Sequence, residues 1–235
     1  MAVRLGKRHK ANLESAPKEA LPAEQAVAAL KKFKGPKFDQ TVNVAIHLNI
    51  DPAQAEQGIR GSVSLPRGIG ASKRVVAFCT ADKSAECKAA GAIEAGGEDL
   101  VAKIEGGWME FDVAVATPDM MRVVSRLGKV LGPKGLMPSP KTGSVTPKVV
   151  EAVKEFSAGK VEFRNDKGGN VHAVLGKMSF KENDLAENLA AFIGHIERLR
   201  PSTTKGAFIK KVVVSGAMTP GVQVHYVSAV EETQK

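Results

Sequence analysis

Apolar and polar residues alternate most regularly between residues 41 and 48. An alternation with a period of two predicts a β-strand that has one buried face and one polar face. Upstream, an alanine-rich segment that begins near Pro22 predicts a helix with Val27 and Leu30 on one side. The apolar members of the strand are Val42, Val44, Ile46 and Leu48, and its polar members include Thr41, Asn43 and His47.

The pattern changes from about Ser72, where short buried strands begin to alternate with helices. Strands are predicted over residues 74–79 and 112–116. Thr117-Pro118 and Thr146-Pro147 each place a capping hydroxyl before a first-turn proline, so helices are expected to follow them, as far as about residues 127 and 156. This succession predicts a small α/β unit in the middle of the chain.

A second alternating pattern follows Gly159 and predicts a hairpin, with strands over 161–164 and 171–175 joined by a turn. Ser179 and Glu182 are spaced as a capping box for a helix with an apolar stripe from Leu185 to Leu199. Two further strands are predicted near residues 209–214 and 222–226.

The stretch from Gly128 to Gly143 differs from all of these elements, because its sixteen residues include four glycines, three prolines and three lysines, and no carboxylate. Proline fixes φ and lacks a donor, whereas glycine admits positive φ, so we expect a shaped surface loop that is neither a helix nor a central strand. Such a loop suits phosphate oxygens, and a plain solvated loop is the alternative. Between Met120 and Val150 the ionisable residues are all basic: Arg122, Arg126, Lys129, Lys134, Lys141 and Lys148.

The overall charge favours an acidic partner such as nucleic acid, because 34 Lys and Arg face 25 Asp and Glu, a formal net charge of +9. Residues 69–159 hold 12 basic and 11 acidic side chains (+1), so the two flanks hold 22 and 14 (+8). Only 5% of the residues are aromatic, with one Trp and one Tyr, so the stacking platform of single-strand binders is missing. A folded RNA, recognised through phosphates, 2′-hydroxyls and shape, fits this composition better.

No catalytic, metal or cofactor site is expected. Cys79 and Cys87 lie eight residues apart without a CxxC pair, the histidines are scattered singly, and no nucleophile elbow, Walker A or HExxH motif occurs. A nucleotide-binding α/β enzyme is the alternative, suggested by the α/β middle and Gly68-Ile69-Gly70, but this GxG lacks a third glycine and precedes its strand. A DNA regulator lacks a recognition-helix motif.

No apolar run reaches the roughly 18 to 20 residues that span a bilayer, and the N-terminus lacks the apolar core of a signal peptide. A soluble, cytoplasmic protein without a membrane partner is therefore expected.

Four segments closely resemble the bacterial-type ribosomal protein L-one family: RGSVSLPRG, FDVAVATPDMMRVVSRLGKVLGPKGLMPSPKTGSVT, FRNDKGGNVHAVLGK and TTKGAFIKKV. The match covers nearly the whole chain. The resemblance implies an α/β fold of two domains joined by a two-stranded hinge. The expected outer domain is α+β and discontinuous (1–68 and 160–235), and the inserted domain is a Rossmann-like three-layer α/β unit (69–159). The residue pattern alone shows the change in composition, but not that the flanks meet.

The resemblance also implies a function without catalysis. It points to a constituent of the large ribosomal subunit that binds 23S-type rRNA in the mobile stalk and assists release of deacylated tRNA from the exit site. Repression of its own operon mRNA and a monomeric state off the ribosome are implied as well, and no cofactor is expected.

Carried over to this chain, the RNA-binding surface of the family lies on the outer domain. It comprises Lys37, Phe38, Thr41, Arg60, Arg164, Lys167, Ser215, Met218, Thr219 and Gly221. Phe38 offers a flat apolar patch, Thr41 a hydrogen bond to a 2′-hydroxyl, and the cations neutralise phosphates; core packing is the alternative for Phe38. The basic loop of the inserted domain forms a secondary surface: Arg122, Arg126, Lys129, Lys134 and Lys141.

The last turn departs from the family, which has Thr-Met-Gly where this chain has Ala217, Met218 and Thr219. A hydroxyl is lost there, at a cost of about 0.5 to 1.5 kcal/mol in a buried interface. Thr219 or Ser215 is expected to compensate.

Overall fold

The computed structural model describes residues 5–204 and 206–226. Contacts within the chain divide it into unit 1, which combines residues 1–70 with 163–235, and unit 2, which comprises residues 71–162. The domain boundaries expected from the sequence, after residues 68 and 159, lie two and three residues earlier than the unit boundaries after residues 70 and 162. The ends of the expected outer domain, residues 1–4 and 227–235, fall outside the described residues.

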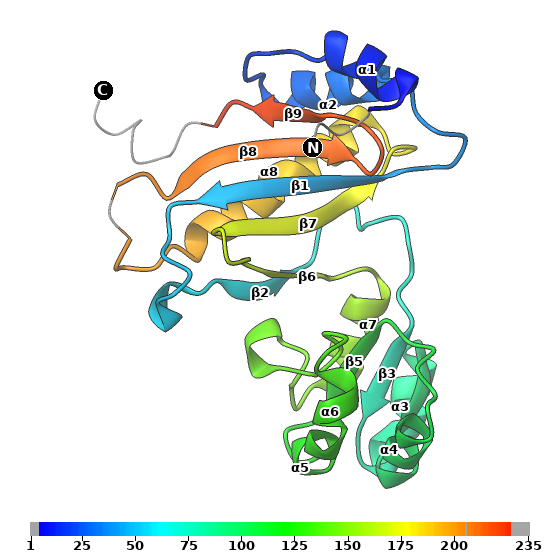
Figure 1. The fold of residues 1–235 in the computed structure, drawn as a ribbon. Helices are drawn as coiled ribbons and strands as arrows, with labels where there is room; N and C mark the ends of the chain where they lie inside the picture. Colours follow the sequence, from blue (N-terminus) through cyan, green and yellow to red (C-terminus); the bar gives the residue numbers. More distant parts are fainter. Residues whose placement is uncertain (1–4, 205, 227–235) are drawn as a thin grey trace. The chain divides into compact units, whose positions relative to one another are not determined.

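Unit 1 is built around a four-stranded antiparallel sheet with the order β7-β1-β8-β9, shown in Figure 1. Buried and half-exposed side chains alternate along β1, so the strand predicted from the alternation is confirmed. Its buried members pack beneath the helices, and its polar members face the other side. The strands are β1 (Thr41–Leu48), β7 (Asn170–Lys177), β8 (Ile209–Gly216) and β9 (Gly221–Val224).

Helices α2 (Ala23–Lys32) and α8 (Glu182–Arg198) contact each other and cover one face of this sheet. The predicted apolar stripe of α8 is largely buried, and α2 begins one residue after Pro22. A short helix α1 (Lys7–Glu14) is fastened by Asn12, whose amide exchanges two hydrogen bonds with the backbone of Lys34 at 3.0 and 3.1 Å. The fully buried members of the α8 stripe are Leu185, Leu189, Phe192 and Ile196.

Two short strands of unit 1 form a separate two-stranded sheet, β2 (Arg60–Val63) with β6 (Val161–Arg164), and the unit limit falls within β6. Phe163 of β6 meets the ring of Phe192 edge-on, with 5.6 Å between the ring centroids. A single-turn helix η1 (Ala55–Gln57) precedes β2.

Unit 2 is a three-layer α/β sandwich around a parallel sheet with the order β4-β3-β5. One face packs against α3 and α7, with Phe156 fully buried, and the other against α4 and the helical segment after β5, with Phe78 fully buried. The mixed α/β fold class predicted from the sequence is thus confirmed. The elements are β3 (Val75–Phe78), α3 (Ala81–Ala89), β4 (Ala92–Gly96), α4 (Glu98–Glu105), β5 (Val113–Ala116), α5 (Met121–Val124), η2 (Ser125–Leu127), α6 (Gly128–Leu131), η3 (Pro140–Thr142) and α7 (Val149–Ser157).

The predicted hairpin between β6 and β7 is wrong. β6 pairs with β2 and β7 pairs with β1, and within the described residues a single bridge, between Asn165 and Val171, joins the two segments. Both alternating segments are strands, but each finds its partner in the other flank. The reason is tertiary: in the observed pairing Phe163 lies against Phe192 and Gly61 and is only 3% exposed.

Two predicted helix caps are wrong as well. The Ser179 hydroxyl donates to Asp39 at 2.8 Å, and α8 begins later, at Glu182. The Thr117 hydroxyl is buried without a hydrogen-bond partner within the described residues, and α5 begins only at Met121. In both places a tertiary contact or burial takes the hydroxyl away from the backbone N–H groups that it was expected to cap.

The loop predicted over residues 128–143 is partly helical. Its first four residues form α6, which continues the helical segment 121–127, and Pro140–Thr142 form the short helix η3. Residues 119–132 contain no proline, and Leu127 and Leu131 are fully buried. Packing of these two side chains therefore extends the helix into the glycine-rich stretch.

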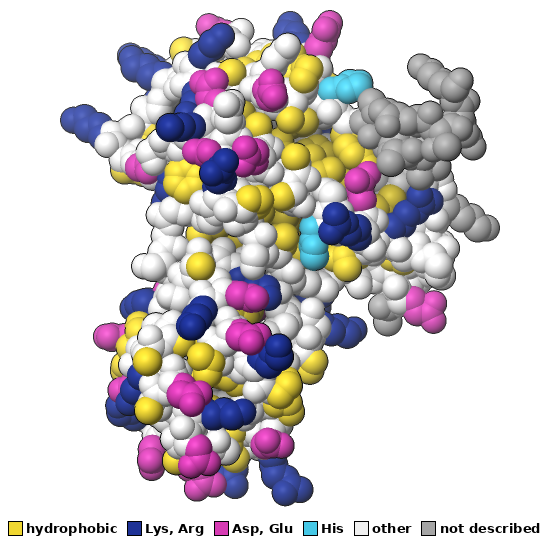
Figure 2. All heavy atoms as spheres, turned by 180° about the vertical axis from the view of Figure 1, so that it is seen from behind, with side chains coloured by type: hydrophobic (Ala, Val, Ile, Leu, Met, Phe, Trp, Pro, Cys, Tyr) yellow, Lys and Arg dark blue, Asp and Glu magenta, His cyan; other side chains and the backbone are white. Residues whose placement is uncertain are grey.

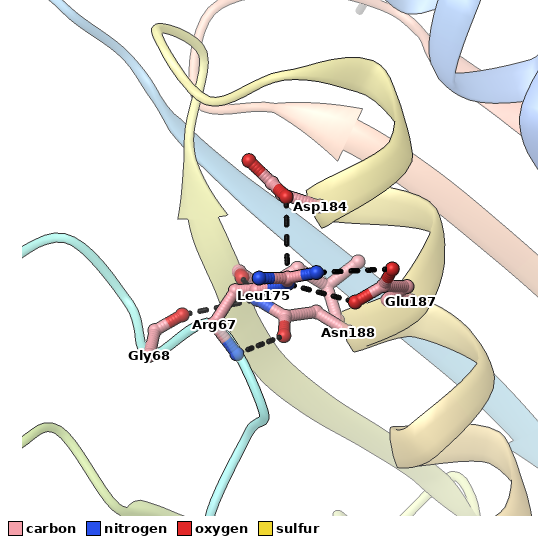
Figure 3. Close-up of polar contacts among 6 residues, drawn as sticks. All are labelled: Arg67, Gly68, Leu175, Asp184, Glu187 and Asn188. Carbon is pink, nitrogen blue, oxygen red and sulfur yellow. Dashed lines mark hydrogen bonds and ion pairs between the residues drawn. The ribbon is translucent and has the colours of Figure 1, made fainter.

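A fully buried asparagine on α8, Asn188, joins three segments of unit 1 (Figure 3). Its Oδ1 accepts the backbone N–H of Arg67 at 3.0 Å, and its Nδ2 donates to the carbonyls of Gly68 at 3.0 Å and of Leu175 at 2.8 Å. Beside it, the Arg67 guanidinium pairs with Glu187 at 2.8 Å. The segment that leads out of unit 1 is therefore attached to α8 and β7.

The turn after β6 is closed by Asp166. Its Oδ1 accepts the backbone N–H groups of Asn170 at 2.7 Å and Gly168 at 2.8 Å, and its Oδ2 accepts the Asn170 side-chain amide at 3.0 Å. These hydrogen bonds, the backbone one from Asn170 foremost, lower the pKa of Asp166 from 3.8 to about 2, and His172 lies 3.6 Å away. The turn thus holds Lys167 at its tip in one conformation.

Replacing Asn188 by alanine is expected to lower the free energy of unfolding by about 2 to 4 kcal/mol, because one N–H and two carbonyls lose partners in the interior. Urea denaturation followed by circular dichroism measures this. Asn183→Ala, at an exposed position of the same helix, is the control and is expected to change stability by less than about 0.5 kcal/mol. Equal stability of the two variants would contradict the assigned role.

Replacing Asp166 by asparagine is expected to lower the melting temperature at pH 7. A carboxylate with a depressed pKa stabilises the fold above its unfolded pKa, and this stabilisation disappears as the pH falls from about 4 to about 2. The difference between wild type and variant should therefore shrink over that window in melts at stepped pH. Asp119→Asn, at an exposed residue, is the control; a pH-independent difference for Asp166→Asn would refute the linkage.

Candidate RNA interface

The structure places the predicted RNA-binding residues in two groups at opposite ends of β1. The register pairs Asn43 with Ser215 and Ser215 with Gly221, so the β8–β9 turn lies beside the first residues of β1. The other end of β1 meets the turn after β6, where the Leu48 N–H donates to Gly169 O at 2.9 Å. Seven residue steps along a strand separate the ends by about 23 Å.

The first group surrounds the start of β1 and comprises Lys37, Phe38, Thr41, Ser215, Met218, Thr219 and Gly221. Phe38 is 56% exposed and Met218 is 52% exposed, so the core-packing alternative for Phe38 is excluded. Both side chains are therefore accessible to a partner and are not part of the core. In the same group, the hydroxyl of Thr41 accepts a hydrogen bond from the Lys177 ammonium at 3.2 Å.

A buried glutamine fixes the β8–β9 turn. Gln40 is 3% exposed, and its side-chain oxygen accepts the backbone N–H of Met218 at 3.0 Å. The Ala217 N–H donates to Thr41 O at 3.0 Å, which ties the turn to β1 directly. This role of Gln40 was not predicted from the sequence. No local pattern could have indicated it, because the residue that Gln40 binds, Met218, lies 178 positions away. The exposed methionine is thus presented on a rigid support.

The expected role of Thr219 needs correction. Its side chain is buried, and its hydroxyl accepts the Gly216 N–H at 2.9 Å inside the turn. The hydroxyl therefore shapes the turn and is not presented to a ligand, so it does not replace the hydroxyl that Ala217 lacks. Ser215 is half-exposed on the same side of the sheet as Thr41 and stays available for this role.

The second group brings together Arg60, Arg164 and Lys167, all exposed. Asn165 joins them, because its N–H donates to Ile59 O at 3.0 Å and its side-chain oxygen accepts the Ile59 N–H at 2.9 Å. Within the described part of the chain none of the three cations has an ion-pair partner. Unpaired cations at fixed positions suit phosphate groups.

The basic stretch of unit 2 exposes all five of its predicted cations: Arg122, Arg126, Lys129, Lys134 and Lys141. The first three are spaced by four and three residues in the helical segment 121–131, which places them near one side of it. From inside, the hydroxyls of Thr142 and Ser144 lie 2.7 Å apart and the Ser144 hydroxyl accepts the Ser139 N–H at 3.0 Å, so the loop end is anchored. Its charges therefore point outward from a packed base.

Basic and acidic side chains are interleaved over both units on the face viewed in Figure 2. That face therefore shows no field of a single sign. Surface ion pairs of the protein, such as Lys103 with Glu94 at 2.9 Å, contribute little to a polyanion site.

The described residues offer no clustered set of metal ligands. No cluster of three or more His, Cys, Asp or Glu side chains is found there. Cys79 and Cys87 are free and buried, and burial raises the pKa of Cys79 to about 12, so its thiol stays protonated. Gly68 and Gly70 have positive φ where the chain leaves unit 1, and the ring of Phe180 lies against Gly70. No helix in the described ranges has the length and apolarity that crossing a membrane requires.

Comparison with known proteins agrees with this arrangement. The large ribosomal subunit protein uL1 of Nocardioides sp. is 49% identical over 219 residues, which cover 93% of this chain and 91% of that protein. Its counterparts are 50% identical over 206 residues in Cutibacterium acnes (88% and 89% covered) and 48% identical over 224 residues in Maridesulfovibrio salexigens (95% and 96% covered). The model of the ribosomal protein L1p/L10e family matches residues 30–220. With matches of this extent and identity, the chain belongs to the ribosomal protein L1p/L10e family.

Proposed function

We propose that this protein is a non-enzymatic constituent of the large ribosomal subunit that binds 23S-type rRNA through unit 1. The observation that carries the proposal is the pair of exposed apolar side chains, Phe38 and Met218, on a rigid sheet end. Flat apolar groups pack against riboses and bases, and the neighbouring cations neutralise phosphates. The relatives with nearly half of their residues identical are named as proteins of that subunit.

The separation of the two groups supports a folded RNA as the ligand. Cations some 23 Å from the apolar pair can both be contacted by a compact RNA whose phosphates are held in place. A flexible single strand would lose more conformational entropy on binding both groups at once. The predicted surface residues also include no row of aromatic side chains on which its bases could stack. An rRNA stem with fixed geometry is therefore the favoured ligand.

The basic stretch of unit 2 is proposed to contact the departing, deacylated tRNA at the exit site. Its five exposed cations, without a carboxylate between Met120 and Val150, give a sequence-independent attraction for phosphates. Such contacts form and release readily, as the movement of tRNA requires.

Repression of its own operon mRNA is proposed to use the surface of unit 1. A messenger that folds so as to present its phosphates and riboses like the rRNA site would compete for the same side chains. The protein then represses translation when rRNA sites are filled, and it acts as a monomer off the ribosome. Substitutions of Phe38 and Met218 are expected to weaken binding of the messenger and of the rRNA to similar degrees.

Phe38→Ala and Met218→Ala are each expected to weaken binding to a 23S-type rRNA fragment about 10-fold or more, because a stacking or packing contact contributes about 1 to 3 kcal/mol. Filter binding at fixed salt measures this. Leu199→Ala and Ile93→Ala are matched controls, since both remove an exposed apolar side chain elsewhere (37% and 47% exposed). Wild-type affinity in both site variants would reject the assigned surface.

Replacing Lys129, Lys134 and Lys141 together by alanine is expected to weaken tRNA binding and to lower the slope of log affinity against log salt by about 2, because each lost phosphate contact removes about 0.7 to 0.9. Affinity for the rRNA fragment should change less than about 2-fold. A triple variant of Lys83, Lys88 and Lys154 makes the same charge change elsewhere in unit 2. An equal loss of tRNA affinity in both triple variants would speak against a specific tRNA surface.

A further inference from the structure

A cavity of about 500 Å³ lies between the first turn of α1 and the β8–β9 turn. One wall is formed by residues 6–9, and the other by residues 217–219. A volume of this size falls in the range that accommodates small-molecule-sized groups. None of the α1 residues in this wall is among the RNA-binding residues that the family resemblance implies.

The chemistry of the cavity is cationic and lacks a carboxylate. Lys7, Arg8 and His9 line one wall, and the other consists of Ala217, Met218 and Thr219. The hydroxyl of Thr219 is already used inside the turn, so the wall that carries polar donors is the α1 wall. The lining surface is mostly apolar and its only charged side chains are basic, so it suits a ligand that combines an apolar face with anionic oxygens.

The Arg8 guanidinium supplies the second observation. Its Nε is buried and has no hydrogen-bond partner among the described residues. A buried donor without an acceptor costs free energy, and nearly all such donors in proteins are paired. Arg8 lines the cavity, and its guanidinium carries four further N–H donors besides the one at Nε that can meet an acceptor entering the cavity.

Both walls are fixed before any ligand arrives. The Asn12 side chain holds α1 to the backbone of Lys34, and Gln40 holds the backbone of Met218. The cavity also continues the surface already assigned to RNA, because the exposed Met218 belongs to both. An RNA seated on Phe38 and Met218 therefore brings its backbone to the mouth of the cavity.

We infer that this cavity receives a phosphate–ribose segment of the bound rRNA, with Arg8 donating to its oxygens and α1 forming a further part of the RNA interface. Lys7 and His9 add donors at the rim, and Met218 packs against the sugar. The inference rests on the proposed function and deepens it, because it adds to the rRNA surface a side chain that sequence comparison did not single out.

The test is filter binding of the full-length chain to a 23S-type rRNA fragment over a range of salt concentrations. Arg8→Ala should lower affinity about 10-fold and the log–log salt slope by about 0.7 to 0.9, the contribution of one phosphate contact. Arg8→Lys should keep the slope but recover only part of the affinity, because lysine lacks the planar fork of donors. Lys10→Ala, on the same helix but outside the cavity wall, should bind within about 2-fold of wild type.

Melting of the free protein separates a binding role from a structural one. Since the Arg8 Nε has no hydrogen-bond partner among the residues that the structure describes, Arg8→Ala should melt at or above the wild-type temperature. A photo-reactive residue in place of His9 should cross-link to the RNA, whereas one in place of Lys10 should not.

Three outcomes overturn the inference: Arg8→Ala binding like wild type, Lys10→Ala losing as much as Arg8→Ala, or no cross-link from position 9. Each leaves the proposed function intact if wild type binds and the Phe38 and Met218 variants are weakened. A wild-type protein that fails to bind the fragment at low salt overturns the proposed function itself, and the inference with it.

Discussion

The pairing of β1 with β7 on one side and with β8 on the other is the interaction on which unit 1 depends. It joins two flanks of the chain that are separated by the whole of unit 2; His47 and Asn170, which share a hydrogen bond of 2.8 Å, are 123 positions apart. Closing so long a loop costs only slightly more entropy than closing a short one, because the cost grows with the logarithm of its length. The buried apolar face of β1 then stabilises the pairing.

Buried amide side chains add further connections between distant segments of unit 1. Asn12, Gln40 and Asn188 each connect backbone segments that are distant in sequence, and each is nearly or fully buried. A buried amide is favourable only when its hydrogen bonds are made, so each of these residues stabilises one arrangement of its neighbours and disfavours alternatives. Two of them hold elements of the proposed RNA surface, and the third holds the segment that leaves unit 1.

Charge is distributed differently in the two units, in keeping with the two contacts that we propose for them. In unit 1 the exposed apolar side chains lie at one end of β1 and three of the assigned cations lie at the other end, and this fixed separation favours recognition by shape. In unit 2 the basic residues between 120 and 150 project from a packed base without apolar companions among the strongly exposed side chains of that stretch. That arrangement favours weak contacts with phosphates that depend on salt.

Local spacing in the chain was enough to place β1, α2, strands β3 and β5 of unit 2 and the apolar stripe of α8, because periods of two and 3.6 residues report directly which side chains are buried. Strand β4 was not predicted from the sequence. The charge surplus and scarcity of aromatics likewise indicated a folded RNA, and the family resemblance named the residues. Local spacing did not reveal which strands pair with one another. The segments of β6 and β7 were expected to form a hairpin, yet β6 pairs with β2 and β7 pairs with β1. The exposure of Phe38, the inward hydroxyl of Thr219 and the burial of the Arg8 Nε were also decided by tertiary structure. A strand's partner and a side chain's surroundings depend on the summed burial of segments far apart in sequence, and no local pattern carries that sum.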